Sequence, residues 1–226
     1  MNNTIQLYRR MIFTFLGILL VISPVFSQEN YKGKAWKDSI PQIPGKIQCE
    51  FYDLGGEGIA FHDSDSINSG SGGLNPADGT YLNEFRIKES VDISYTKKKD
   101  HVDDNPYNMV TPEMNQLYVG WTNPGEWINY TVNVTKSGNY TVGLRYTANG
   151  NGTISLSIDG MDVSGNILVP TTHQDKDSVA WRQWHHWNHV DPITQVKLEK
   201  GIHVLRLTTV ANGNMNYDYL EFKLKE

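Results

Sequence analysis

Alternation of apolar and polar side chains constrains the fold of this chain more than any other feature. The segments INYTVNV (128–134), YTVGLRY (140–146) and ISLSI (154–158) alternate with a period of two, which is typical of strands that bury one face. Residues that favour turns separate these segments, and no segment keeps a helical period for three turns. The pattern predicts an all-β fold.

Further segments carry the same kind of strand-forming residues. They are IQCEFYD (47–53), GIAF (58–61), VDISYT (91–96), QLYVGW (116–121), QVKL (195–198), HVLRLTTV (203–210) and YDYLEFKL (217–224). About ten short antiparallel strands with turns every ~8–12 residues predict a β-sandwich of jelly-roll type. Two stretches rich in Gly, Ser, Asn, Asp and Pro, 62–84 and 97–115, interrupt this rhythm, and we expect them to be surface loops.

The N-terminus carries the features of a secretory signal peptide. Two arginines precede the apolar run MIFTFLGILLVI, and residues typical of a cleavage region follow it before Gln28. The run is about a dozen residues, shorter than the ~20 needed to cross a bilayer, so we expect no membrane span. We therefore expect residues 1–27 to be a signal peptide, 28–43 a leader or linker, and 44–226 one domain. The protein would be exported to the periplasm, the cell surface or the medium.

Charge and cysteine content restrict the partners and the sources of stability. Loss of residues 1–27 removes two arginines and no acids, which leaves 18 Lys and Arg against 25 Asp and Glu, a net charge of −7. No basic stripe is present to neutralise phosphates, so we do not expect nucleic acid as a partner. Cys49 is the only cysteine, so stability must come from the core or from a bound ion rather than from an intramolecular disulfide.

Five segments, in order, carry a resemblance to a known family. IQCEFYDLGGEGIAFHD, FRIKESVDI, YVGWTNPGEWINYTVNV, KLEKGIHVLRL and NMNYDYLEF resemble the family 6 carbohydrate-binding modules over roughly residues 44–226. Such modules are β-sandwich domains appended to secreted enzymes that degrade polysaccharides. The resemblance implies non-catalytic binding of a plant, algal or microbial polysaccharide of xylan or β-glucan type. The protein would act alone or beside separately encoded glycoside hydrolases.

The resemblance also implies a site for sugar. In this family a tyrosine and a tryptophan clamp one sugar ring in a cleft among the loops at one end of the sandwich, and an asparagine binds its hydroxyl groups. An aromatic ring stacks on the C–H groups of a pyranose face, and amide groups form hydrogen bonds with the hydroxyl groups at the edge of the sugar. The position of the tyrosine matches Phe85, whose ring can stack on a sugar in the same way. The asparagine matches Asn216. Some members have a second cleft on the concave face that uses a carboxylate near the position of Glu57.

The tryptophan of the clamp has two possible registers in SVAWRQWHHWNHV (178–190). The family pattern Trp-x-x-Trp places the first tryptophan in the loop and the second in the core. Trp184 and Trp187 fit this pattern better, because the residues after Trp187 resemble the family's Trp-x-x-Val continuation. In the alternative register Trp181 stacks on the sugar and Trp184 is buried.

The histidines of the same segment do not predict a metal site. His185 and His189 are four residues apart, which is about 13 Å in an extended strand, too far to share an ion unless the loop folds back. We expect these histidines to supply polar contacts at the rim of the cleft or to be solvated.

A structural calcium ion is also usual in the family. Ca²⁺ takes several oxygen ligands, which combine carboxylates with amide and backbone carbonyls. By resemblance Gln48, Glu50 and Asp218, with the carbonyl of Arg86, would hold the ion. Gln48 and Glu50 are two residues apart, so we expect both to point to one face of the first strand, beside Asp218 on the last strand.

Two other classes of function remain open on the sequence. A glycosidase needs two carboxylates ~5–10 Å apart, and the candidates are Glu57, Asp63, Asp65 and Glu126. No nucleophile motif and no Gly-rich phosphate loop before a helix accompany them. The other class is a secreted adhesion or protein-interaction module on the same fold.

Overall fold

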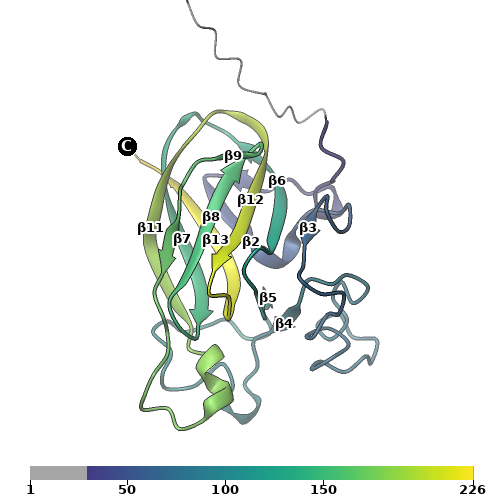
Figure 1. Ribbon diagram of the computed structural model, residues 1–226, viewed down its shortest axis with the longest axis vertical. Helices are drawn as coiled ribbons and strands as arrows, with labels where there is room; N and C mark the ends of the chain where they lie inside the picture. Colours follow the sequence, from purple (N-terminus) through teal and green to yellow (C-terminus); the bar gives the residue numbers. More distant parts are fainter. Residues whose placement is uncertain (1–29, 226) are drawn as a thin grey trace, which may run out of the picture.

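The computed structural model describes residues 30–225, which form two β-sheets packed face to face (Figure 1). The predicted signal peptide, 1–27, lies outside the described residues. Thirteen strands and a few short 3₁₀ turns make up the regular structure of residues 30–225, so the prediction of an all-β sandwich is confirmed. In this part of the chain, no helix is long and apolar enough to span a membrane.

The larger sheet has the strand order β1-β6-β12-β8-β10, with β3 beside β6 and β9 beside β8. Its strands are β1 (Gln42–Ile43), β3 (Phe61–His62), β6 (Trp127–Val134), β8 (Gly152–Ile158), β9 (Met161–Asp162), β10 (Ile167–Val169) and β12 (Gly201–Ala211). Strand β1 runs parallel to β6, whereas the other pairs of this sheet are antiparallel. The expectation of antiparallel strands therefore holds except at β1.

The second sheet has the order β11-β7-β13-β5-β4, with β2 beside β13. Its strands are β2 (Gly45–Gln48), β4 (Ile93–Tyr95), β5 (Leu117–Val119), β7 (Gly138–Ala148), β11 (Asn188–Leu198) and β13 (Met215–Leu224). The expected first strand, 47–53, is wrong in its second half: β2 ends at Gln48, and Cys49–Phe51 form a 3₁₀ turn, η3. Its pairing with the last strand is as expected, with Gln48 opposite Tyr219.

The core lies between the two sheets and follows the alternation seen in the sequence. In β8 the residues Ile154, Leu156 and Ile158 are buried, and the serines between them are partly exposed. Burial of one apolar face contributes about 25 cal/mol per Å² and is the main stabilising term in a domain without disulfides. The lone cysteine, Cys49, is fully buried in this core.

The segment expected to be a leader or linker, 28–43, is packed against the sandwich over its described residues. Strand β1 pairs with β6, Ile43 is fully buried, and Trp36 packs on the core. The domain therefore begins before residue 44. The sequence did not reveal this packing, because the segment is mostly polar and only a few of its apolar side chains contact the sandwich.

The insertion 62–84 is a loop that is hydrogen-bonded to the second sheet. The side-chain oxygen of Asn68 accepts hydrogen bonds from the backbone N–H groups of Gly70, Ser71 and Ile93. Gly70 lies so close to β4 that a Cβ there would be 2.0 Å from the carbonyl oxygen of Ile93. Only glycine allows this approach, so the insertion is held as an ordered part of the surface.

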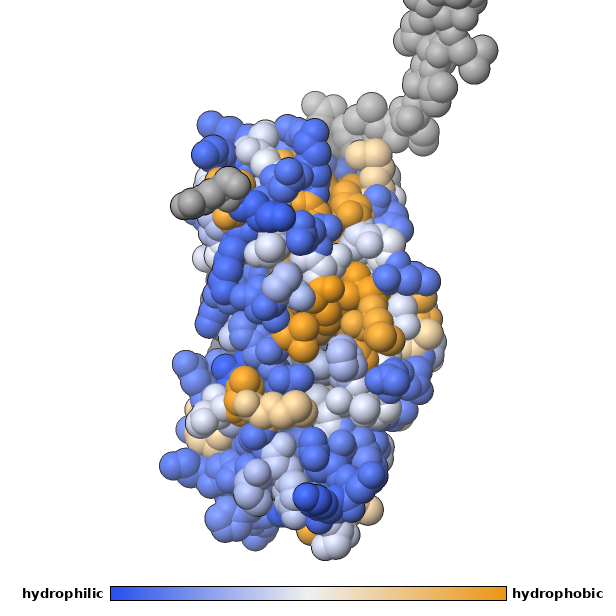
Figure 2. Space-filling model, turned by 90° about the vertical axis from the view of Figure 1, so that its left-hand side faces the viewer, coloured by the Kyte–Doolittle hydropathy of each residue, from blue (hydrophilic) through white to orange (hydrophobic). Residues whose placement is uncertain are grey.

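The edges of the two sheets come together at β10 and β11. Figure 2 shows this side of the molecule, where apolar side chains gather midway along the long axis and hydrophilic ones cover most of the rest. Leu168 of β10 is 64% exposed. On this side of the molecule, apolar side chains therefore reach the surface at the open edge of the sandwich.

Two isoleucines of the N-terminal segment test whether it belongs to the folded domain. Ile43 is fully buried, whereas Ile40 is 41% exposed. We expect Ile43→Ala to lower the free energy of unfolding by about 2–4 kcal/mol, through lost apolar contacts and a residual cavity. The matched variant Ile40→Ala should change it by less than about 0.5 kcal/mol. Urea denaturation measures both, and equal small effects would contradict the docking of this segment.

Candidate functional site

The loop between β10 and β11 carries the three tryptophans of the 178–190 segment, at the lower end of the view in Figure 1. Its 3₁₀ turn η5 (Ala180–Trp184) presents Trp181, which is 49% exposed. Trp184 is partly exposed, and Trp187 is fully buried against Tyr118, with ring centroids 5.3 Å apart. This distribution agrees with the register in which Trp187 is the core residue and Trp184 belongs to the loop.

A buried carboxylate, Asp177, organises this loop from inside. It accepts two hydrogen bonds of 2.7 Å from the guanidinium of Arg182 and pairs at 2.8 Å with Nε2 of His186. The hydrogen bonds from Arg182 hold the pKa of Asp177 well below its ordinary value. Gln183 donates to the carbonyls of Gln174 and Asp177 and closes the same network. The loop is therefore held by charge-assisted hydrogen bonds rather than by the burial of its outer tryptophans.

The insertion 97–115 supports the loop from the other side through a second buried carboxylate, Asp103. Its Oδ1 accepts a hydrogen bond from the indole N–H of Trp187 at 2.7 Å and lies 3.0 Å from Nδ1 of His185. The backbone N–H of Trp187 donates to Asn108, and its carbonyl accepts from Met109 and Val110. The insertion thus provides hydrogen-bond partners for the backbone groups just before β11.

The histidines of the loop occupy positions that differ from the expectation. His186 is fully buried and contacts Asp177 and the carbonyl of Thr172, so it is neither solvated nor at a rim. His185 is largely covered and faces Asp103. An imidazole can join two polar partners inside a loop because it has two ring nitrogens, and this explains their placement.

Asn216, the predicted sugar-binding amide, lies next to Trp184 but is only 4% exposed. Its amide group donates to the backbone carbonyl of Trp184 at 2.7 Å and to the hydroxyl of Thr147 at 2.9 Å. Its side-chain oxygen lies 2.8 Å from the place where a Cβ of Gly120 would be. The structure therefore brings Asn216 and Trp184 together, and Asn216 positions the backbone of the tryptophan.

A shallow groove lies beside Trp184 at this end of the sandwich. Its lining includes Trp184, Asn149, His173, Asp175 and Ser178. The ring of His173 lies 2.9 Å from the side-chain oxygen of Asn149, which orients both groups. One aromatic wall with an amide, an imidazole, a carboxylate and a hydroxyl is the combination that a sugar ring requires. Sequence reasoning missed Asn149 and His173, which lie in separate turns and form no motif.

Trp121 is another exposed aromatic residue that the sequence did not single out. It is 39% exposed and has a positive φ of 48°, which is a genuine outlier for a bulky side chain. It follows Gly120, which contacts Asn216. Strained backbone often marks a functional position, which makes Trp121 a further aromatic candidate.

Phe85 does not take part in an open cleft. It is 3% exposed and belongs to the core cluster. The rings of Trp36, Phe51 and Tyr81 lie around it, with centroid distances of 5.3, 5.9 and 5.3 Å. The expected stacking face of Phe85 is therefore covered, because the N-terminal segment and the insertion 62–84 each place an aromatic ring against it.

Glu57 lies elsewhere on the molecule and is exposed. One of its oxygens is 2.5 Å from Nδ1 of His62, and the other accepts a hydrogen bond from the backbone of Asp63. His62 in turn lies near Trp127, with ring centroids 6.3 Å apart. The structure therefore separates Glu57 from the groove at Trp184 and places it beside β3 and β6.

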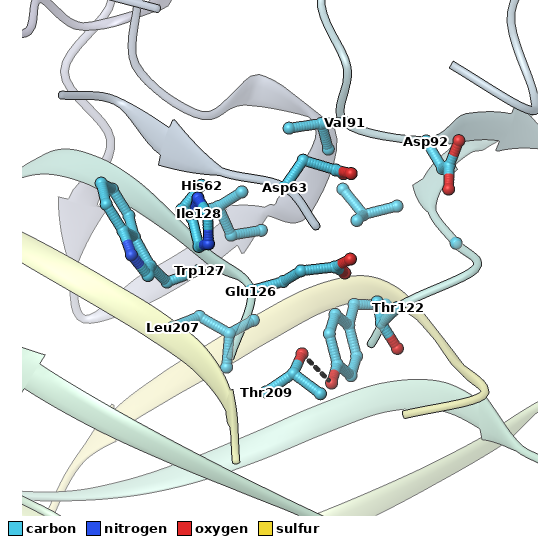
Figure 3. A pocket seen from close by; sticks show the side chains of 13 residues that line it. His62, Asp63, Val91, Asp92, Thr122, Glu126, Trp127, Ile128, Leu207 and Thr209 are labelled. Carbon is cyan, nitrogen blue, oxygen red and sulfur yellow. Dashed lines mark hydrogen bonds between the residues drawn. The ribbon is translucent and has the colours of Figure 1, made fainter. Parts of the chain in front are cut away.

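A second pocket brings together two of the four candidate carboxylates of the enzymatic alternative, Asp63 and Glu126. Figure 3 shows Asp63 and Glu126 pointing toward the same space, with Asp92 on its far side. Burial, with a smaller contribution from the neighbouring carboxylates, raises the pKa of Asp63 and of Asp92 to about 7. Both oxygens of Glu126 accept hydrogen bonds, from Ser64 and Asn123, so this residue ties the insertion 62–84 to the turn before β6.

The predicted calcium ligands include three buried oxygens that lack any hydrogen-bond partner. They are Oε1 of Gln48, Oε2 of Glu50 and Oδ1 of Asp218. Buried acceptors without partners are rare in folded proteins and call for an unseen partner. Burial raises the pKa of Glu50 above its ordinary value and that of Asp218 to about 7. The oxygens present therefore fit a hard cation such as Ca²⁺.

Two details of this cation site differ from the expectation. Glu50 lies in η3 rather than in a strand, so the argument from alternating faces was wrong, although its oxygen is buried as required. The Arg86 carbonyl accepts a hydrogen bond from the backbone of Glu89 at 2.9 Å, which leaves one lone pair for an ion. Nε of Arg145 lies 3.3 Å from the other oxygen of Asp218 and offsets part of its charge.

An all-β sandwich with an aromatic groove among its loops defines a class of ligand-binding modules. The family model for carbohydrate binding module (family 6) matches residues 93–224, which is more than half of the chain. The chain belongs to this family of carbohydrate-binding modules. No curated protein is significantly similar to it.

Solved structures of similar fold include both isolated modules and a module within an enzyme. A glycoside hydrolase family 43 arabinoxylan arabinofuranohydrolase from Bacillus subtilis, in complex with cellotetraose, is 14% identical with a TM-score of 0.51. The match covers 83% of this chain and 28% of that one. Module CBM6cm-2 of Cellvibrio mixtus lichenase 5A, in complex with cellotriose, is 18% identical (TM-score 0.48), covering 81% of this chain and 98% of that one. A β-1,3-glucan binding module from Bacillus halodurans is 14% identical (TM-score 0.48), covering 82% and 99%.

The raised pKa values in the second pocket predict a specific pH dependence. Asp63 has a pKa of about 7 in the folded state and an ordinary value of 3.8, so the folded state holds more protons between pH 4 and 7. Its contribution to stability is therefore lost as the pH rises through this window. We expect Asp63→Asn to raise the Tm at pH 8 by on the order of 2 °C and to leave it unchanged at pH 4.

The control for this prediction is Asp162→Asn, whose side chain also accepts backbone hydrogen bonds in an exposed turn. Thermal unfolding followed by circular dichroism at both pH values measures the difference. If Asp63→Asn and the parent chain show the same pH dependence, the carboxyl group is not buried as described.

Proposed function

We propose that this chain is a non-catalytic module that binds a polysaccharide of xylan or β-glucan type at the groove beside Trp184. Membership of carbohydrate-binding module family 6 supports carbohydrate as the ligand. One observation supports the place: Trp184 is partly exposed and lines the groove, while Asn216 donates a hydrogen bond to its backbone carbonyl at 2.7 Å. A tryptophan fixed in this way loses little conformational entropy when a sugar stacks on it.

The proposed surface is an aromatic platform rather than a two-sided clamp. Trp181 is 49% exposed on the same 3₁₀ turn and would add a second aromatic surface to the platform. Phe85 has no part in it, because Trp36 and Tyr81 cover its ring. A platform that is open on one side suits the interior of a long polysaccharide as well as its end.

The charges of the groove support binding without catalysis. Of its carboxylates, Asp175 is exposed, and Asp177 is engaged by Arg182 and His186. A carboxylate whose pKa is held low by a guanidinium is a poor proton donor and cannot act as the general acid of a glycosidase. Hydrolysis would have to use the separate pocket of Asp63 and Glu126.

Substitution of single tryptophans tests this proposal. We expect Trp184→Ala to weaken binding of xylan or β-glucan oligosaccharides at least tenfold, through loss of the stacking surface, with little change in Tm. Trp181→Ala should have a smaller effect, and Trp121→Ala measures the contribution of the other exposed tryptophan. Isothermal titration calorimetry against a panel of soluble xylan, laminarin and mixed-linkage glucan measures the affinities.

The same experiment separates binding from catalysis. Reducing ends should not appear during incubation with any glycan that binds. Release of reducing ends that is lost in Glu126→Gln or Asp63→Asn would overturn the non-catalytic proposal. Wild-type affinity in Trp184→Ala would instead remove the proposed platform.

We also propose that Gln48, Glu50, Asp218 and the Arg86 carbonyl hold a structural Ca²⁺. Three unpartnered buried oxygens on β2, η3 and β13 support this proposal. The ion would neutralise Glu50 and the part of the Asp218 charge that Arg145 does not offset, and it would join the first and last strands of the second sheet. In a chain without a disulfide this link between distant segments adds to stability.

Removal of the ion tests the calcium proposal. We expect a chelator to lower the Tm by several degrees and added Ca²⁺ to restore it. Without the ion, Asp218 with its pKa of about 7 costs stability as the pH rises from 4 to 7, so the effect of Ca²⁺ should be larger at pH 8 than at pH 5. Glu50→Gln should abolish the Ca²⁺ dependence, and the exposed control Glu199→Gln should keep it. A Tm that does not change when the chelator is added would contradict the proposed calcium site.

We further propose that the protein is exported and meets its glycan outside the cytoplasm. The arginine pair, the apolar run and the cleavage region within 1–27 support export. An exported module of this kind would act alone or beside separately encoded glycoside hydrolases.

A further inference from the structure

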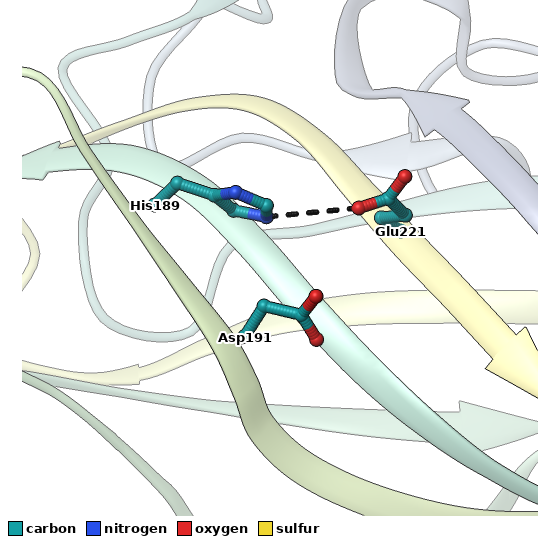
Figure 4. Close-up of side chains that lie close together, drawn as sticks. All are labelled: His189, Asp191 and Glu221. Atoms are coloured by element: carbon teal, nitrogen blue, oxygen red, sulfur yellow. Dashed lines mark ion pairs between the residues drawn. The ribbon is translucent and has the colours of Figure 1, made fainter. Parts of the chain in front are cut away.

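Three potential metal ligands converge on the outer face of the second sheet, away from the groove and from the proposed calcium site. Figure 4 shows His189 and Asp191 of β11 and Glu221 of β13 facing one another. One ligand atom from each residue lies within 4.8 Å of the other two. Neither the sugar site nor the core uses these side chains.

The backbone beneath the three residues makes room for this arrangement. Glu221 pairs with Gly143 of β7, and β11 lies on the other side of β7 with Val190 opposite Leu144. A Cβ at Gly143 would be 2.9 Å from Nε2 of His189 and 3.2 Å from Asp191. The missing side chain leaves a hollow in the middle of the sheet, over which side chains from the two flanking strands can meet.

An irregularity in β11 also directs its side chains toward this hollow. The register between β11 and β7 shifts between Val190 and Thr194, directly after the first three strand residues. Such bulges bend a strand and re-aim the side chains next to it. Asp191 lies within this bulge, so its position over Gly143 is a consequence of the irregular register.

The imidazole of His189 has a nitrogen that is shielded from solvent and lacks a hydrogen-bond partner. Its Nε2 lies 3.9 Å from Oε2 of Glu221, which is too long for a hydrogen bond. Two ligands that are each about 2.1 Å from one metal ion can span about 4 Å. A neutral imidazole nitrogen without a hydrogen-bond partner is the form of histidine that binds metals.

We propose that His189, Asp191 and Glu221 form a binding site for Zn²⁺ on the outer face of the second sheet. One imidazole nitrogen and two carboxylate oxygens are ligands that Zn²⁺ accepts, and a water molecule completes four-coordination. The nitrogen ligand distinguishes this site from the all-oxygen calcium site. The proposal is independent of the proposed sugar binding.

The ammonium group of Lys223 shows that the two carboxylates already attract a cation. It contacts Asp191 and lies 3.1 Å from Oε2 of Glu221. Zn²⁺ has to displace this group, whose side chain is about half exposed and free to swing into solvent. Lys223 therefore competes with the metal and limits its affinity, and Lys223→Met should bind Zn²⁺ more tightly.

Titration of the chain with Zn²⁺ in the presence of excess Ca²⁺ tests this site. Isothermal titration calorimetry should show one Zn²⁺ per chain. His189→Gln should weaken binding at least tenfold, and Lys223→Met should strengthen it at least threefold. The matched control is His101→Gln, because His101 is an exposed histidine 3.3 Å from a single carboxylate, Asp104, and its loss should leave the affinity unchanged.

A second measurement does not depend on the folding of any variant. In ¹⁵N spectra of the imidazole rings of the unaltered chain, Zn²⁺ should move the Nε2 signal of His189 more than that of any other histidine. Retention of full affinity in His189→Gln, a ring signal of His189 that does not move, or no binding in either the parent chain or Lys223→Met would each overturn the proposal. Loss of sugar binding in Trp184→Ala would have no bearing on it.

Discussion

Two buried carboxylates, Asp103 and Asp177, hold the part of this molecule that faces the proposed ligand. An aromatic side chain that must stay exposed to bind sugar cannot be fixed by its own burial. Asp177 therefore binds Arg182 and His186 inside the loop, and Asp103 binds the indole of Trp187 from the neighbouring insertion. Because these charged groups are buried and fully hydrogen-bonded, removal of either carboxylate would leave unpaired donors in the interior.

The parts of the fold that stabilise the domain are separate from the proposed binding groove. The sandwich buries one apolar face of each sheet, and the N-terminal segment closes its side through β1 and Trp36. The same segment covers Phe85, so a surface that the family resemblance assigned to sugar has become part of the core. The groove beside Trp184 is built instead from the turns that follow β7 and β10, with Asn149 and His173 at its rim.

Period-two alternation was sufficient to predict the all-β class and the strands β6, β7 and β8, because each buries a full apolar face. Alternation did not predict β1, β9 and β10, since strands of two or three residues are too short to show a period. Of the sites, the separation of Trp184 from Trp187 followed from the family spacing. The burial of Phe85 did not, because it depends on Trp36 and Tyr81, which are distant in sequence. The same holds for Asp103 and Asp177, whose polar loops gave no sign of burial.

The indole N–H signals of the tryptophans provide the most direct test of the central claim, that Trp184 forms the ligand surface. Each tryptophan gives one such signal in a ¹H–¹⁵N spectrum, and single substitutions assign them. During titration with xylan or β-glucan oligosaccharides, the signal of Trp184 should shift most. The signal of Trp187, whose N–H is bonded to Asp103, should stay nearly in place. Shifts confined to Trp127 or Trp36, with none at Trp184, would contradict the account.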